Sequence, residues 1–149
     1  MHKKIYASGF LYHTPTQQVL LQQHESSAPT WSLFSGEGQD GEDPIVIFKE
    51  IVSSQLKIKL SLKDINSIYD YFNEELSRHS HLLYALADKK KDTYTNEGYT
   101  MRWFTFKEIY KLPIDRQTRQ DITVGKRVID AITRSNEPQE EKPLHERTQ

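Results

Sequence analysis

The sequence predicts a single α/β domain, on two observations. Runs of aromatic and aliphatic residues of strand length recur along the chain, and amphipathic stretches of helical length lie between and after them. The chain has 149 residues, and a domain of about 150 residues buries roughly 68–70% of the surface of its unfolded chain. We therefore expect one hydrophobic core and one domain, spanning residues 1–134.

The first third of the chain predicts two strands, a loop and a helix. Residues 4–12 and 19–23 are rich in aromatic and aliphatic side chains, and a proline-containing segment between them suits a turn. Residues 29–44 contain three glycines and four acidic residues, which predicts a long polar loop. A helix is expected at 44–57, because Pro44 suits a first turn and apolar side chains recur there at helical spacing.

The remainder predicts three more strands and a long helix. The expected strands are residues 64–73, 81–87 and 99–106. Polar segments at 74–80 and 88–98 suit connections, the second as an exposed hairpin loop. A short helix is expected near Lys107, and residues 118–134 have one apolar side at helical spacing. Residues 135–149 are too polar to bury a core, so we expect a disordered tail.

Composition excludes several classes of protein. The chain has no cysteine, which excludes disulfides, thiolate nucleophiles and thiolate zinc sites. Its net charge is −1, so no overall basic field recruits nucleic acid, and a nucleic-acid partner is not expected. No segment approaches the roughly 18 apolar residues that cross a bilayer. We expect no membrane partner and a cytoplasmic location.

Two histidines, His79 and His81, alternate in the sequence. On a strand, alternate residues face the same side, which is the arrangement of a pair of metal ligands. The neighbouring sequence shows no third ligand, so we interpret both as surface residues.

A motif precedes the predicted helix, and another precedes the last strand. Residues 31–36 read Trp-Ser-Leu-Phe-Ser-Gly, five residues separate Gly36 from Glu42, and residues 41–44 read Gly-Glu-Asp-Pro. Residues 96–98 read Asn-Glu-Gly and precede a strand that contains Trp103. These pieces resemble the Nudix family, whose signature begins with Gly, five residues and Glu, within motifs that read Trp-x-Leu-Pro-Gly-Gly and Gly-Glu-Ser-Pro. The resemblance spans roughly residues 4–134.

The resemblance implies a Nudix fold, an α/β/α sandwich with a mixed sheet. It also implies a pyrophosphate-binding site next to the predicted helix, where the family has Arg-Glu-U-x-Glu-Glu-x-Gly-U, with U a bulky aliphatic residue. The glutamates of that pattern lie on one helix face and share divalent ions, which neutralise a pyrophosphate and supply a nucleophilic water. If the chain is active, its implied cofactor is Mg²⁺ or Mn²⁺.

This chain departs from the helical pattern, and two alignments remain open. In the first, one residue is deleted from the preceding loop. Lys49 and Glu50 then match the family's Arg-Glu pair, and Ser53 and Ser54 replace the paired glutamates. Leu56 takes the position of the glycine. One carboxylate of three remains in this alignment.

In the second alignment nothing is deleted. Glu50 then takes the arginine position and Ile51 the position of the first glutamate. Ser54 and Gln55 replace the glutamate pair, and Lys57 takes the position of the glycine. No carboxylate remains in this alignment.

Four glutamates are candidates for the chemistry that the resemblance implies. Glu50, Glu42 and Glu37 are candidate metal ligands, and Glu50 and Glu97 are candidate catalytic residues. Each also has an ordinary explanation. Glu50 suits an exposed helix surface, and Glu42 suits the start of a helix through the helix dipole. Glu97 suits a Glu-Gly turn, and Glu37 suits a solvated loop.

Three residues are candidates for contacting substrate: Trp31, Gly36 and Lys49. Trp31 and Gly36 belong to the motif before the helix, and Lys49 matches the family's arginine in the first alignment. For Trp31 the alternative is an anchor in the core.

The leading functional hypothesis is a Nudix-related protein that binds a nucleotide or another diphosphate-linked ligand and hydrolyses it weakly or not at all. One alternative is an active, metal-dependent pyrophosphohydrolase of nucleoside diphosphate derivatives. The other is a protein-interaction module that keeps only the scaffold. The partner expected under the first two hypotheses is a small molecule, and the sequence leaves the oligomeric state open.

Overall fold

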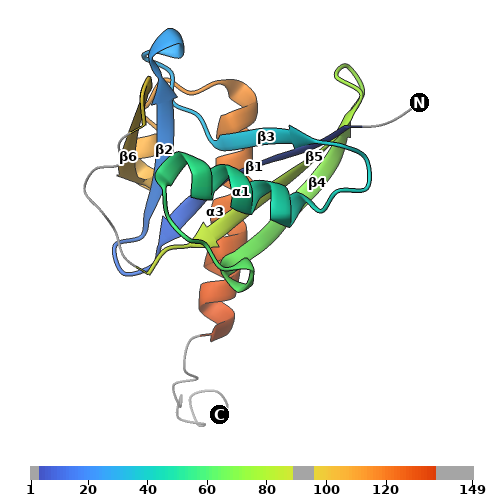
Figure 1. Ribbon diagram of the computed structural model, residues 1–149. Coiled ribbons are helices and arrows are strands. Elements are labelled where there is room, and N and C mark those ends of the chain that lie inside the picture. Colours follow the sequence, from blue (N-terminus) through green and yellow to red (C-terminus); the bar gives the residue numbers. More distant parts are fainter. Residues whose placement is uncertain (1–3, 89–95, 137–149) are drawn as a thin grey trace, which may run out of the picture.

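A mixed sheet of six strands lies between helices in the computed structural model, which describes residues 4–88 and 96–136 (Figure 1). The strands are β1 (Lys4–His13), β2 (Gln18–His24), β3 (Phe34–Gly38), β4 (Ile65–Asn73), β5 (Arg78–Leu86) and β6 (Tyr99–Thr105). The helices are α1 (Pro44–Leu56), α2 (Phe106–Ile109) and α3 (Arg116–Asn136). This architecture confirms the predicted α/β class with a mixed sheet. No helix in the described ranges is long and apolar enough to cross a membrane.

Strand β1 organises the sheet, whose order is β4-β5-β1-β2-β6. One edge of β1 pairs in parallel with β5 from Lys4 to Tyr12. Its other edge is divided, because antiparallel β3 takes the first half and antiparallel β2 takes the last three residues. Two segments that are distant in sequence therefore meet side by side along one strand.

Helix α1 covers one face of the sheet. Alternate residues of β1, among them Ile5, Ala7 and Leu11, are buried in the same cluster as Phe48 and Val52 of α1. Both α1 side chains are fully buried. The period of two in the strand and of about 3.6 in the helix places these side chains opposite one another.

Helix α3 covers the other face. The intervening residues of β1, Phe10 and Tyr12, are buried in one cluster with Ile122 and Ile129 of α3. Figure 1 shows α1 and α3 on opposite sides of the sheet. The molecule is therefore the α/β/α sandwich that the sequence resemblance implies.

The predicted polar loop at 29–44 is wrong in part, because it contains strand β3. Phe34 is fully buried, and residues 34–38 pair with β1. Gly36 and Gly38 lie directly under α1, where a Cβ would collide with the side chains of Ile51 and Ile47. The glycines that suggested irregular backbone are there because α1 packs closely on this strand.

Three other boundaries differ from the prediction. Strand β5 begins at Arg78, because a four-residue turn returns the chain directly from β4. Helix α3 begins at Arg116. The side chain of Asp115, which precedes it, caps the first turn by accepting a hydrogen bond from the N–H of Thr118 at 2.9 Å. The helix continues to Asn136, past the predicted start of the tail. Most of the predicted hairpin loop (89–95) and the rest of the predicted tail (137–149) lie outside the described residues.

Candidate functional site

A cleft of about 340 Å³ opens between the sheet and the start of α3. Strands β1, β3, β4 and β5 form its floor, and Asp115, Gln117 and Asp121 lie on its α3 side. Ser32 and Ser35 also line it, from the tryptophan- and glycine-containing motif at residues 31–36. The motif thus borders a cleft on the face of the sheet that α1 does not cover.

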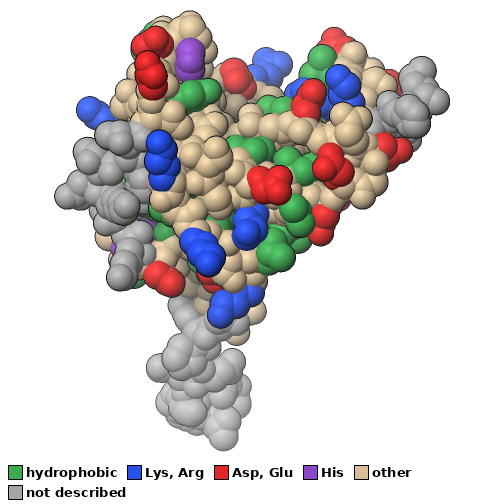
Figure 2. Space-filling view, in the orientation of Figure 1, with side chains coloured by type: hydrophobic (Ala, Val, Ile, Leu, Met, Phe, Trp, Pro, Cys, Tyr) green, Lys and Arg blue, Asp and Glu red, His purple; other side chains and the backbone are tan. Residues whose placement is uncertain are grey.

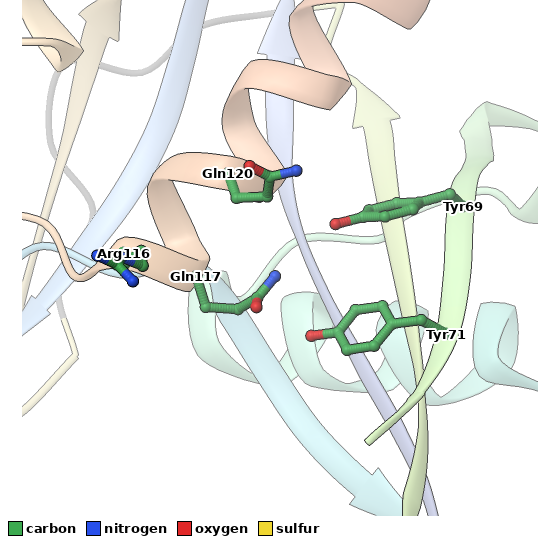
Figure 3. Close-up of a pocket in the computed structure, with 5 residues that line it drawn as sticks. All are labelled: Tyr69, Tyr71, Arg116, Gln117 and Gln120. Carbon is green, nitrogen blue, oxygen red and sulfur yellow. The ribbon is translucent and has the colours of Figure 1, made fainter. Parts of the chain in front are cut away.

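A second cavity of about 350 Å³ adjoins the first, since Tyr71 and Gln117 line both. Figure 3 shows Tyr69 and Tyr71 pointing from β4 toward α3, with Gln117 and Gln120 reaching toward the two rings. The ring centroids of the tyrosines lie 5.8 Å apart, with planes tilted by 37°. Together they present an aromatic surface edged by amide groups.

A buried carboxylate links the two sides of the cleft. The hydroxyl of Tyr69 donates to Oδ1 of Asp121 at 2.6 Å, and Nε2 of Gln117 donates to the same oxygen at 2.9 Å. Asp121 is 6% exposed, and this burial raises the pKa of its carboxyl group. Burial and the hydrogen bond to Asp121 also raise the pKa of Tyr69. The network fixes the start of α3 against β4.

Arg78 brings positive charge to the cleft. Its guanidinium lies 3.7 Å from the centroid of the Tyr6 ring and pairs with Glu37 at 3.5 Å. The Nε of Arg78 is buried and has no hydrogen-bond partner. Lys4 also pairs with Glu37, at 3.7 Å. Glu37, a predicted metal ligand, therefore lies between two cationic side chains in this structure.

The other three candidate carboxylates do not gather around one point. Glu42 accepts a hydrogen bond from the N–H of Gln39 in its own loop, while Glu50 and Glu97 are exposed on different elements. Within 4–88 and 96–136, one group of three or more residues has ligand atoms close enough to share a metal ion, and none of the four predicted glutamates belongs to it. Figure 2 shows acidic side chains on the α1 face spread among basic and apolar ones.

None of the three predicted substrate contacts lines either cavity. Trp31 is 8% exposed and packs edge-on against Phe104 at a centroid distance of 5.0 Å, in the core under α3. Gly36 lies beneath Ile51, on the α1 face of β3. Lys49 is half-buried on α1. Their roles in substrate binding stay predictions.

Sequence reasoning missed the residues that do line the cavities. Tyr69 and Tyr71 alternate on a correctly predicted strand, which signals that they share a face. Nothing in the sequence says that α3 covers that face. The contribution of Gln117 and Asp121 depends on how α3 packs, which local patterns do not contain.

The sequence matches no family model and no curated protein, whereas the structure is similar to many solved structures. One is the Nudix domain of Shewanella oneidensis NrtR in complex with ADP-ribose, with a TM-score of 0.65, 14% identity, and coverage of 85% of this chain and 88% of that one. Another is a MutT/Nudix family protein from Listeria innocua, with a TM-score of 0.61, 12% identity, and coverage of 88% and 94%. This chain has the Nudix fold.

A third similar structure is the C-terminal domain of mouse MUTYH, solved in complex with human PCNA. Its TM-score is 0.66 at 14% identity, and the match covers 99% of each chain. At these identities the likeness concerns the fold alone, and the two Nudix structures confirm the fold expected from the sequence motifs.

Within this Nudix fold, α1 lies where the motifs place the signature helix. The burial and backbone conformation of its C-terminal half bear on its alignment with the signature. Leu56 is the last helical residue and is 4% exposed. Lys57 follows in the left-handed conformation, with φ of 56°. The side chain of Ile51 lies against Gly36 of β3. Val52, next to it, is fully buried in the core.

The C-terminal half of α1 also meets the second Nudix-like motif. Nδ2 of Asn96 donates to the backbone carbonyl of Gln55 at 3.2 Å. The Oγ of Ser53 and the Oε1 of Gln55 are buried and have no hydrogen-bond partner. The end of α1 and residues 96–98 are therefore neighbours, although about 40 residues separate them.

Proposed function

We propose that this protein binds a nucleotide or another diphosphate-linked ligand in the cleft between the sheet and α3, and hydrolyses it slowly or not at all. The observation that carries the second half of this proposal is the backbone at the end of α1. It favours one of the two alignments of the helix with the Nudix signature.

The two alignments place the signature glycine at Leu56 or at Lys57. Leu56 is helical and buried, whereas Lys57 has the positive φ that glycine adopts most readily at the end of a helix. Without a deletion, Val52 takes the signature position of the bulky aliphatic residue that follows the first glutamate. Val52 is fully buried, as such a residue in the core requires. Both features support the alignment without a deletion.

In that alignment the helix has no carboxylate at the three positions that hold metal in the family. Ile51 occupies the first, with its side chain packed on Gly36. Ser54 and Gln55 occupy the others, and their oxygens are neutral. Mg²⁺ and Mn²⁺ favour carboxylate and other oxygen ligands, so loss of three negative charges removes most of the attraction of this helix for either ion. Glu50 takes the arginine position and is exposed.

The chemistry of the two cavities supports the first half of the proposal. Tyr69 and Tyr71 offer aromatic faces to a base, and Gln117 offers both a hydrogen-bond donor and an acceptor. Arg78 and Arg116 supply the cationic groups that suit phosphate oxygens. The ADP-ribose bound to the Nudix domain of NrtR is a ligand of this class.

Binding is tested by calorimetric titration with ADP-ribose, nucleoside di- and triphosphates and nucleotide sugars, without divalent metal. Tyr71→Ala should weaken binding of the preferred ligand by roughly 5- to 100-fold, the range expected for loss of one aromatic stacking partner. Tyr110→Ala is the matched control, because Tyr110 is 54% exposed and does not line either cavity. Equal effects of the two substitutions would contradict the assignment of the cleft.

Hydrolysis is tested on the same compounds with Mg²⁺ and with Mn²⁺, beside a Glu50→Gln variant. We expect no turnover above that of the variant. Turnover that Glu50→Gln abolishes would overturn the proposal and favour a pyrophosphohydrolase that uses Glu37, Glu42, Glu50 and Glu97. Absence of any binding would instead favour the protein-interaction module.

A further inference from the structure

We propose that Asp70, His79 and His81 form a binding site for a divalent transition-metal ion, with Zn²⁺ as the best-suited ion. Each residue offers one ligand atom, and the three atoms all lie within 4.8 Å of one another. This site is separate from the proposed nucleotide cleft and from the signature helix positions. No residue of the group belongs to the Nudix-like motifs.

The register of β4 and β5 assembles the three side chains. His79 and His81 alternate on β5, so they share a face, and their rings stack with centroids 4.5 Å apart and planes inclined by 22°. Asp70 pairs directly with His81 across the antiparallel ladder. Nε2 of His79 lies 2.8 Å from Oδ1 of Asp70. The missing third ligand thus comes from the neighbouring strand.

The sheet holds the group in place from both sides. Strand β5 lies between β4 and β1, and in the parallel ladder His79 pairs with Ile5 and His81 with Ala7. Ile5 and Ala7 are both buried under α1. Two ligands on one strand and a third on its hydrogen-bonded neighbour lose little conformational freedom when an ion binds, which favours affinity.

The ligand set selects the class of ion. Imidazole nitrogens suit Zn²⁺, Cu²⁺ and Ni²⁺, whereas Mg²⁺ prefers oxygen ligands in octahedral geometry. Two histidines and one carboxylate leave a coordination position open, as in zinc sites that also bind water or substrate. The side chains of His79 and Asp70 are 38% and 55% exposed, so an ion reaches them from solvent. Binding replaces the hydrogen bond between His79 and Asp70 with bonds from both side chains to the ion.

The site and the nucleotide cleft lie on opposite faces of the same strand. Tyr69 and Tyr71 point toward α3 (Figure 3), whereas Asp70, between them, belongs to the other face. The two proposals can therefore fail separately. Tyr71→Ala is expected to leave metal binding unchanged.

The test is a calorimetric titration of the full chain, without a histidine tag, with Zn²⁺ in excess Mg²⁺. We expect one ion per chain at this site, and His81→Gln or Asp70→Asn should weaken its binding by at least the roughly 10- to 100-fold that loss of a metal ligand's hydrogen-bond partner costs. The control is His24→Gln, because His24 contacts Ser26 and does not belong to the group.

A second measurement locates the ion without any substitution. In NMR spectra of the intact chain, Zn²⁺ should shift the imidazole resonances of His79 and His81 and leave those of His13 and His24 in place. No binding at micromolar Zn²⁺ would overturn the proposal. So would binding that both variants retain, or imidazole shifts confined to other histidines.

Discussion

At the scale of single residues, a few side chains set the chemistry of each face of the sheet. Asp121 is buried and accepts hydrogen bonds from Tyr69 and Gln117. Its pKa is raised, chiefly by burial. A carboxyl group with a raised pKa in the folded state stabilises the fold at low pH, and this contribution is lost as pH rises through the folded-state pKa.

Asp121→Asn tests this contribution, because the amide keeps an oxygen that accepts both hydrogen bonds but removes the charge. We expect the stability of the variant relative to the original chain to increase as pH rises from about 4 toward neutral. The measurement is urea unfolding of both chains across that pH range. A constant or decreasing difference would show that the buried carboxylate carries no such penalty.

Gly9 is a second residue on which the fold depends. A Cβ at this position of β1 would overlap the backbone carbonyl of Leu83 on β5, as well as the ring of Phe48. Gly9→Ala should therefore destabilise the protein by at least the roughly 1–3 kcal/mol typical of an overpacked core. Gly41→Ala is the comparison, since a Cβ there meets nothing within 4 Å and the cost comes only from its positive φ. Equal losses in thermal unfolding would contradict the packing argument.

At the scale of elements, the register of helix α1 relative to the Nudix signature determines how many of the signature carboxylates the chain keeps. The bounds of the helix could be predicted from Pro44 and the apolar spacing, and the structure ends it one residue earlier than expected. Its register relative to the signature could not be predicted. Lys49-Glu50 resembles the family's Arg-Glu pair, but matching the two requires a deletion in the preceding loop. We infer the register from the positive φ of Lys57, a backbone dihedral that is not visible in the residue type.

Lys57→Gly tests that register. Glycine adopts a positive φ without the cost that lysine bears, so we expect the free energy of unfolding to rise by about 0.5–1 kcal/mol. Ser54→Gly, at an exposed position inside the same helix, should lower it by up to about 1 kcal/mol. Both are measured by chemical denaturation. If Lys57→Gly destabilised the protein instead, the helix would not end as described.

Strand β3 and the pair β4–β5 show why element predictions failed where they did. Gly36 and Gly38 serve the packing of α1, a tertiary requirement that resembles a loop signal in the sequence. The alternation of His79 and His81 indicates a shared face only if both lie on a strand, and the strand was expected to begin at 81. Asp70 joins them through the strand register alone. Local patterns give the face of a side chain and leave its neighbour across the sheet undetermined.

At the scale of the whole molecule, the sheet separates two proposed sites with different chemistry. The face under α3 carries the tyrosine-lined cleft, and the face under α1 carries the Asp70–His79–His81 group. The fold could be predicted because the Nudix-like motifs occur in the right order along the chain. The cleft could not, because it forms where β4 meets the start of α3, two segments about 50 residues apart.

The central claim, binding without appreciable hydrolysis, is tested most directly by phosphorus NMR of ADP-ribose and the nucleotide panel with stoichiometric protein and Mg²⁺. We predict that the resonances of the preferred ligand shift or broaden while no monophosphate resonance appears. Monophosphate resonances that grow with time, and that Glu50→Gln abolishes, would contradict it. Spectra unchanged by the protein for every compound would contradict it equally.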